Sequence, residues 1–293
     1  MAETLLKMRP ADLLNVLFLA FLLAVTVVFH QRIDHPWAPI SLYLALLLCQ
    51  GGLIFFQNRN SVVRLFYDIL FPLISILCIF DSLGWIVHSV NPRDIDPLLI
   101  RLDFMLFNGT PALMLEKMQT PLLTDVLQVS YSSYYFLPLI LGFSLKANGE
   151  NLRFERSLFL VMLCFYLSYI GYLLWPALGP RFSIQALQET RLSGFLIADP
   201  VRDLLNRLEG IKRDAFPSGH TGVSLVVLYL AFRFRRRLFW FFLPVVMALI
   251  FSTVYCRYHY VVDVIAGIAL TLVTIIIGET YYGYRSKRIH TDS

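Results

Sequence analysis

The sequence predicts an all-α protein, a polytopic membrane bundle of about eight helical spans. Of its 293 residues, 57% are hydrophobic and only 15% are charged, and the mean hydropathy is +0.65. A soluble domain carries about a quarter of its residues as charged side chains. Apolar windows of about 20 residues, long enough to cross a bilayer, also recur along the chain. These observations favour membrane helices that share one core.

Eight apolar windows define the expected spans. They cover residues 13–29, 38–56, 65–87, 122–145, 155–176, 218–234, 237–256 and 259–283. Lys7 and Arg9 precede the first window, as in a signal peptide. That window is long enough to span the membrane, however, and no small-residue cleavage site follows it. We therefore retain it as the first span.

The connection 88–121 contains a segment expected to lie in the membrane interface. Leucines and methionines recur at helical spacing within residues 97–118, with Arg101 and Asp103 between them, and the Asn-Gly-Thr-Pro sequence at 108–111 interrupts the pattern. The expected organisation is N-terminal spans with this interface helix (1–120), a catalytic helical core (121–284) and a cytoplasmic tail (285–293).

Positive charges indicate the orientation in the membrane. With eight spans, 14 of the 25 Lys and Arg residues fall on the side that holds both termini. Of the other 11, six lie in the single long loop 177–217, and long loops carry little weight. The basic turn 232–237 is the strongest single marker. Both termini are therefore expected in the cytoplasm, with the opposite face periplasmic or lumenal.

Charge and cysteine content narrow the functional classes. The net charge of +5 lies mostly in loops, which fits membrane topology and not nucleic-acid binding. Cys49, Cys78, Cys164 and Cys256 are far apart, in or beside apolar runs, with neither metal-ligand spacing nor a disulfide framework. We expect them to be small buried hydrophobic residues.

Residues 215–222, Ala-Phe-Pro-Ser-Gly-His-Thr-Gly, precede an apolar helix and have an anion-binding pattern. Pro217 and Ser218 suit a first helical turn, and Gly219 lets the backbone approach a ligand closely. The free N–H groups of such a turn bind anions, and His220 could donate a proton to a phosphate oxygen. A capped helix whose His220 sits at the interface explains the motif equally well when it is taken alone.

A second motif surrounds His259. On a helix, His259 and Asp263 would share a face, because they are four residues apart. An aspartate that accepts one imidazole N–H fixes the tautomer and makes the other nitrogen a better nucleophile. Asp263 lies in an apolar run, where a charge is costly and by default functional. The alternative is an ion pair at the edge of the span.

Arg181 follows the fifth span in a proline-rich turn, where a guanidinium can hold phosphate in a bidentate manner. Alone this signal is weak, because arginines at span ends usually meet lipid headgroups. With eight spans, however, Arg181, His220, Arg257 and His259 all fall on the same membrane face. That coincidence predicts a single site.

The order Arg, Pro-Ser-Gly-His, His-x-x-x-Asp resembles the type-2 phosphatidic acid phosphatase superfamily, whose core is shared with vanadium haloperoxidases. The core resemblance covers about 155–283. The whole-chain layout, with Tyr-Ser-Ser-Tyr-Tyr at 131–135, is most similar to the inositolphosphotransferase and aureobasidin-sensitive inositol phosphorylceramide synthase subgroup. The resemblance implies that His259 is the nucleophile, that Asp263 orients it and that His220 is the general acid. It assigns Arg181, Ser218 and Gly219 to phosphate binding, and it implies neither metal nor cofactor.

The chain departs from the family pattern at three positions. The lysine seven residues before Arg181 is Leu174 here, the proline after it is Phe182, and the arginine six residues before His259 is Thr253. Arg257 is four residues after Thr253, nearly on the same face if the helix continues, so we expect Arg257 to bind phosphate in its place. Lys212 or Arg213 could supply the charge of the missing lysine, although a solvated loop charge explains both equally well.

The expected reaction passes a phosphoryl group or phospho-headgroup from a lipid phosphate or phosphodiester to His259, then to an alcohol acceptor or to water. The partners are membrane lipids: a phospholipid donor and, for a transferase, ceramide or diacylglycerol as acceptor. A simple lipid-phosphate phosphatase is the close alternative, because both activities use the same residues. A non-catalytic lipid-binding or flipping protein is the remote alternative. It would not need both histidines, Asp263 and the arginines together on one membrane face. The oligomeric state stays open.

Overall fold

The computed structural model describes residues 8–291 except 58, 191 and 209, and within this part every regular element is a helix. Six helices are long and apolar enough to cross a membrane: α2 (Pro10–Val28), α3 (Trp37–Phe56), the continuous run Ser61–Val90, α10 (Asn151–Leu174), α14 (Arg236–Tyr255) and the Val261–Tyr284 part of α15 (Val261–Thr291). The run Ser61–Val90 consists of α4 (Ser61–Leu65), the π-helical turn η2 (Phe66–Leu70) and α5 (Phe71–Val90). The prediction of a multi-pass helical membrane protein is confirmed.

Two predicted segments are bent. The expected fourth span consists of α8 (Pro121–Ser132), the turn η4 (Ser133–Tyr135) and α9 (Leu137–Ala147), with a bend of 48°. The expected interface segment is α6 (Asp96–Phe107) followed by α7 (Pro111–Met114) and η3 (Leu115–Met118), with a bend of 64° where Asn108 adopts the left-handed conformation. Counting each bent pair as one span gives eight, but this set includes the predicted interface segment and lacks the predicted span 218–234.

The expected sixth span is α13 (Gly219–Phe234), which has only 16 residues. At 1.5 Å per residue it is about 24 Å long, shorter than the ~30 Å apolar thickness of a bilayer. It begins inside the Pro-Ser-Gly-His motif, at Gly219, with Ser218 as its N-cap.

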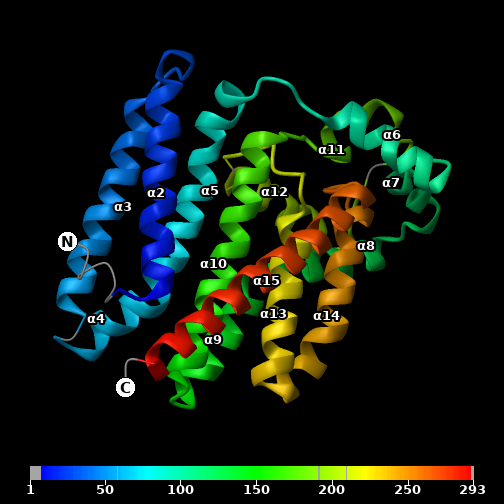
Figure 1. Ribbon diagram of the computed structural model, residues 1–293. Helices are drawn as coiled ribbons and strands as arrows, with labels where there is room; N and C mark the ends of the chain where they lie inside the picture. The colour runs from blue at the N-terminus through cyan, green and yellow to red at the C-terminus, as the bar shows by residue number, and fades with distance from the viewer. Residues whose placement is uncertain (1–7, 58, 191, 209, 292–293) are drawn as a thin grey trace.

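Helix α10 lies at the centre of the bundle. It packs against α2 and α5 on one side and against α9, α13 and α15 on the other, and 72% of its most apolar stretch is buried. Figure 1 shows α2, α3 and α5 on one flank, α13 and α14 on the other, and α15 running obliquely across α10 and α13. The connection after α5 passes over one end of the bundle to α6 and α7.

Two aspartates of α6 bind backbone N–H groups at that end of the bundle. Asp96 accepts hydrogen bonds from the N–H groups of Leu178 and Gly179, both at 2.9 Å. Asp103, fully buried, accepts the N–H groups of Val261 and Val262 at 3.1 and 3.0 Å. Because the first N–H groups of a helix have no partner within it, Asp103 caps α15 from another element. The segment predicted to rest on the membrane interface therefore holds the loops after α10 and before α15.

Replacing Asp103 tests this cap. We expect Asp103→Ala to lower the free energy of unfolding by about 1–3 kcal/mol, because two N–H groups at the start of α15 lose a charged acceptor. The measurement is thermal unfolding in detergent. Arg101→Ala, an exposed position on the same helix, is the control and should change it by no more than about 0.5 kcal/mol. An equal effect of both substitutions would contradict the assignment.

Candidate active site

The turn before α13 is fixed by local contacts. The Phe216–Pro217 peptide bond is cis, and Ser218 caps the helix, its Oγ accepting the N–H of Thr221 at 3.3 Å. A Cβ at position 219 would lie 2.5 Å from the Oη of Tyr172 on α10, so a larger residue there would displace that hydroxyl. The Ser218 and Gly219 of the predicted phosphate-binding turn therefore start a helix packed tightly against α10.

His259 lies in the connection between α14 and α15, and not on a helix as predicted. α14 ends at Tyr255 and α15 begins at Val261. The Nδ1 atom of His259 is 2.8 Å from the carbonyl oxygen of Ala215 and 3.5 Å from Oδ2 of Asp263. The predicted pairing with Asp263 is present, but the main-chain carbonyl is the closer partner. Since a carbonyl can only accept, Nδ1 carries the proton and Nε2 keeps its lone pair.

His220 occupies the first turn of α13 beside His259. The centroids of the two imidazole rings are 5.8 Å apart. Tyr131 stacks on His220 at 4.2 Å, and Tyr134 packs on it at 4.1 Å. The Nε2 atom of His220 is buried and has no hydrogen-bond partner among the described residues. Two tyrosines of the predicted fourth span thus hold the second histidine, leaving one of its nitrogens available.

A small pocket of about 30 Å³ opens at His259, Arg181 and Lys212. The Nη1 atom of Arg181 is buried without a partner among the described residues, and its guanidinium lies 4.4 Å from the ring of Phe182. Of the two residues considered as substitutes for the family lysine, Lys212 lines the pocket. Arg213 does not line it and pairs with Asp94 at 2.7 Å.

Asp214 also lines this pocket, and no motif in the sequence had pointed to it. Removal from water raises the pKa of its carboxyl above the ordinary value, and the neighbouring His259 and Arg181 oppose that shift. A carboxyl group beside Arg181 and His259 in this pocket affects anion binding, because its negative form repels the ligand.

Arg257 does not line the pocket at His259. It follows the end of α14 with a φ of +64°, so it does not continue the helical face of Thr253, and that part of the prediction is wrong. Its guanidinium donates to Glu116 at 2.8 Å and to the Thr190 carbonyl at 2.9 Å. Its Nε is buried without a partner among the described residues.

Arg257 instead lines a second cavity of about 420 Å³, which shares Arg181 and Phe182 with the small pocket. Both cavities therefore meet at Arg181. The remaining walls of the larger cavity are mainly polar loop residues: Gln185, Gln188, Thr190, Leu192, Arg202 and Cys256. Within the described part of the chain, no group of three or more His, Cys, Asp or Glu residues could hold a metal ion.

Comparison with known proteins identifies the family of the chain. The family model described as PAP2 superfamily matches residues 98–277, which is more than half of the chain. The chain belongs to the PAP2 superfamily. Membership supports a lipid phosphatase-type activity, and the match includes every predicted site residue and Asp103 of α6.

A PA-phosphatase related-family protein of Dictyostelium discoideum is 26% identical over 180 residues, covering 54% of this chain and 32% of that protein. The chain thus spans about a third of the length of the curated relative. No solved structure matches the chain.

The titration of Asp214 gives a pH prediction. Its carboxyl is neutral below its pKa and negative above it, and because that pKa is raised, the change falls at higher pH than for an exposed aspartate. We expect the KM for a lipid phosphate to increase as pH rises through this range, and Asp214→Asn to flatten the increase. KM measured between about pH 4 and about pH 8 tests this. Asp34→Asn, an exposed site, is the control, and identical wild-type and Asp214→Asn profiles would refute it.

Proposed function

We propose that this PAP2 protein is a membrane enzyme that moves the phosphoryl group of a lipid phosphate through a phosphohistidine at His259. One observation carries the proposal: the 2.8 Å contact of Nδ1 with the Ala215 carbonyl, which leaves Nε2 as the basic nitrogen beside a pocket with Arg181 and Lys212. A nucleophile held by a second group in this way is typical of covalent catalysis.

The reaction has two steps. Nε2 of His259 attacks phosphorus, the bond between phosphorus and the lipid oxygen breaks, and His220 gives a proton to the departing oxygen. Water or an alcohol then attacks phosphorus, gives its proton to His220, and the phosphorus–nitrogen bond breaks. Asp263 stabilises the positive charge that His259 acquires in the first step.

Three groups would neutralise the charge that develops on the phosphoryl oxygens. These are Arg181, Lys212 and the positive end of the α13 dipole. Lys212 would take the role of the lysine that the family has seven residues before the arginine. On the charge distribution of the loops, we place this site on the periplasmic or lumenal face, with both termini cytoplasmic.

Trapping of the intermediate tests the first step. Purified protein is mixed with phosphatidic acid carrying a labelled phosphate and quenched in alkali, in which phosphohistidine persists. We expect wild type to retain label and His259→Gln to retain none. His220→Gln should slow turnover about 10²–10⁴-fold, the usual contribution of a general acid. His88→Gln, an exposed histidine outside the site, is the matched control. Label retained by His259→Gln would refute the nucleophile.

A transferase is the second candidate, and the 420 Å³ cavity favours it. A phosphatase needs room only for water beside the phosphoryl group, whereas this polar cavity adjoins the pocket at Arg181 and can hold a headgroup or an acceptor alcohol. Glu116, from the segment following α6, forms an ion pair with Arg257, which lines this cavity. The similarity to the inositolphosphotransferase subgroup points the same way, with phosphatidylinositol as donor and ceramide or diacylglycerol as acceptor.

Lipid products distinguish the two activities. Purified protein is given phosphatidic acid or phosphatidylinositol, each with and without ceramide or diacylglycerol. Free phosphate released from phosphatidic acid irrespective of added alcohol identifies a phosphatase. A new phospholipid that forms only when the acceptor is present identifies a transferase.

We also propose that Arg257 contributes positive charge to substrate binding from the larger cavity. Since Arg257→Ala alone leaves Glu116 buried without its partner, the test uses Arg257→Gln with Glu116→Gln, which removes both charges. We expect this double variant to unfold near the wild-type temperature but to lose about 10–150-fold in kcat/KM, the value of one hydrogen bond to a charged group. Arg93→Ala, an exposed loop position, is the control. Unchanged kcat/KM would eliminate the role.

A further inference from the structure

A separate apolar cavity lies away from the catalytic pocket, between α5, α9 and α10. It has a volume of about 90 Å³ and is open to the side of the bundle, where Leu77 and Phe143 are 42% and 50% exposed. Its walls are almost entirely apolar, and Gly142 makes room on the α9 side. A groove of this kind that faces the hydrocarbon region is suited to an alkyl chain.

The two ends of this groove differ. One end is closed by Tyr134, which lines the groove and packs against His220 at 4.1 Å. No described residue lines both the groove and the small catalytic pocket. A substrate chain hanging from the phosphate site therefore has no direct route into the groove.

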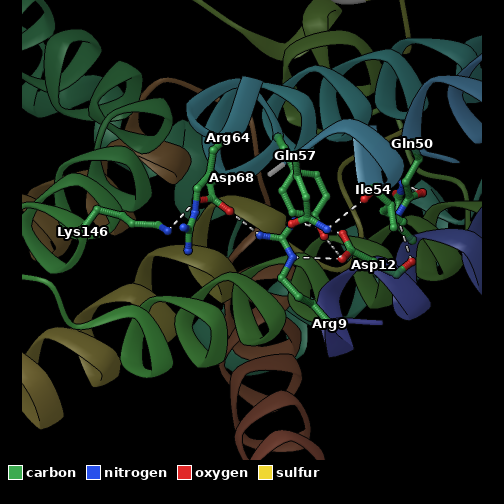
Figure 2. Close-up of polar contacts among 10 residues, drawn as sticks. Arg9, Asp12, Gln50, Ile54, Gln57, Arg64, Asp68 and Lys146 are labelled. Atoms are coloured by element: carbon green, nitrogen blue, oxygen red, sulfur yellow. Dashed lines mark hydrogen bonds and ion pairs between the residues drawn. The ribbon is translucent and has the colours of Figure 1, made fainter. Parts of the chain in front are cut away.

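The other end is polar and cationic. Asp68 lines the groove there and accepts from Lys146 Nζ at 2.5 Å and from Arg9 Nη1 at 2.6 Å, with Arg64 Nε at 3.9 Å, as Figure 2 shows. The π-helical turn η2, in which Asp68 lies, interrupts the helix at this point.

Cations outnumber carboxylates in this cluster. Among the described residues, Arg9, Arg64 and Lys146 pair with Asp68 and Asp12, so three cations meet two carboxylates and the net charge is +1. The Arg64 side chain is 61% exposed, so its guanidinium is available to a ligand at the membrane boundary. An exposed cation near a membrane surface attracts the headgroups of anionic lipids.

The length of the groove matches one leaflet. Its wall on α10 runs from Phe154 to Phe165, a rise of about 17 Å at 1.5 Å per residue, roughly half of the ~30 Å hydrocarbon core. This is the half of α10 remote from Arg181, because α10 reaches that arginine from its other end. A lipid seated here would belong to the leaflet opposite the catalytic pocket.

We infer that the groove binds one acyl chain of an anionic phospholipid, with the headgroup at Arg64 and Lys146 and the chain end at Tyr134. This is a second lipid site, distinct from the substrate site. Its effect on turnover, through the contact of Tyr134 with His220, rests on the proposed function, whereas the binding itself does not.

Photolabelling determines both the site and the direction of the lipid. The full chain in detergent is labelled with phosphatidylglycerol carrying a diazirine either at the end of one acyl chain or near its carbonyl. Cross-linked peptides are identified by mass spectrometry. We expect the terminal diazirine to label residues 134–139 and the carbonyl-proximal one to label residues 68–73 and 143. The reverse order, or no label in these segments, would overturn the proposal.

Headgroup preference is measured with the same probes. Phosphatidylglycerol should label several-fold more than phosphatidylcholine, and Arg64→Gln should abolish the difference. Arg59→Gln, an exposed arginine three residues past α3, is the matched control and should keep it. Equal labelling by both lipids in wild type would refute the anionic headgroup site.

Filling the groove provides the second test. Gly142→Leu should reduce labelling at least fivefold, while Gly51→Leu, where an added side chain meets nothing within 4 Å, should not. If Gly142→Leu unfolds at a lower temperature, Leu77→Trp on the open edge replaces it. Unchanged labelling in the folded variant would overturn the proposal. His259→Gln should label like wild type, so this result does not depend on the catalytic mechanism.

Discussion

The active site depends on the contact between the turn before α13 and the segment that leads into α15. Two hydrogen bonds make it: His259 Nδ1 with the Ala215 carbonyl, and the Ser218 N–H with the Asp263 carbonyl at 3.1 Å. They join residues more than 40 positions apart in sequence and place the two histidines side by side. Gly267 permits this approach, since a Cβ there would lie 2.7 Å from the Ser218 carbonyl oxygen. Neither bond needs a particular side chain at Ala215, because the carbonyl acts as the ligand.

Buried aspartates also bind backbone groups of distant segments, in the loops around the site. Asp96 and Asp103 bind backbone N–H groups after α10 and before α15, and Asp125 of α8 accepts four consecutive N–H groups from residues 195–198. Such loops contain many N–H groups without helical partners, which are costly to bury unless something accepts them. The carboxylates supply the acceptors and make the loops a rigid frame for Arg181 and His259.

Helix α10 connects the two ends of the molecule. One end leads to Arg181 and packs on the phosphate-binding turn through Tyr172, while the other forms the floor of the apolar groove beside Asp68 and Lys146. Tyr134 touches both regions, as groove wall and as a neighbour of His220. The catalytic pocket lies at one end of the bundle and the apolar groove at the other. The two sites can therefore contact lipids of opposite membrane leaflets.

The helical membrane class and the candidate site residues could be predicted from the sequence. Apolar windows about 20 residues long are typical of membrane spans, and Pro and Ser before an apolar run favour a helix N-terminus. Which partners surround these residues depends on tertiary packing. Local spacing predicted that His259 and Asp263 pair on one helical face and that Arg257 shares a face with Thr253. The pair is present at 3.5 Å although His259 lies before α15, but the break after α14 takes Arg257 off the face of Thr253, because helical spacing applies only where the helix continues. Ala215 and Asp214 meet His259, and Asp96 and Asp103 meet the adjoining loops, across long separations in the chain, and such contacts follow from packing and not from any local pattern.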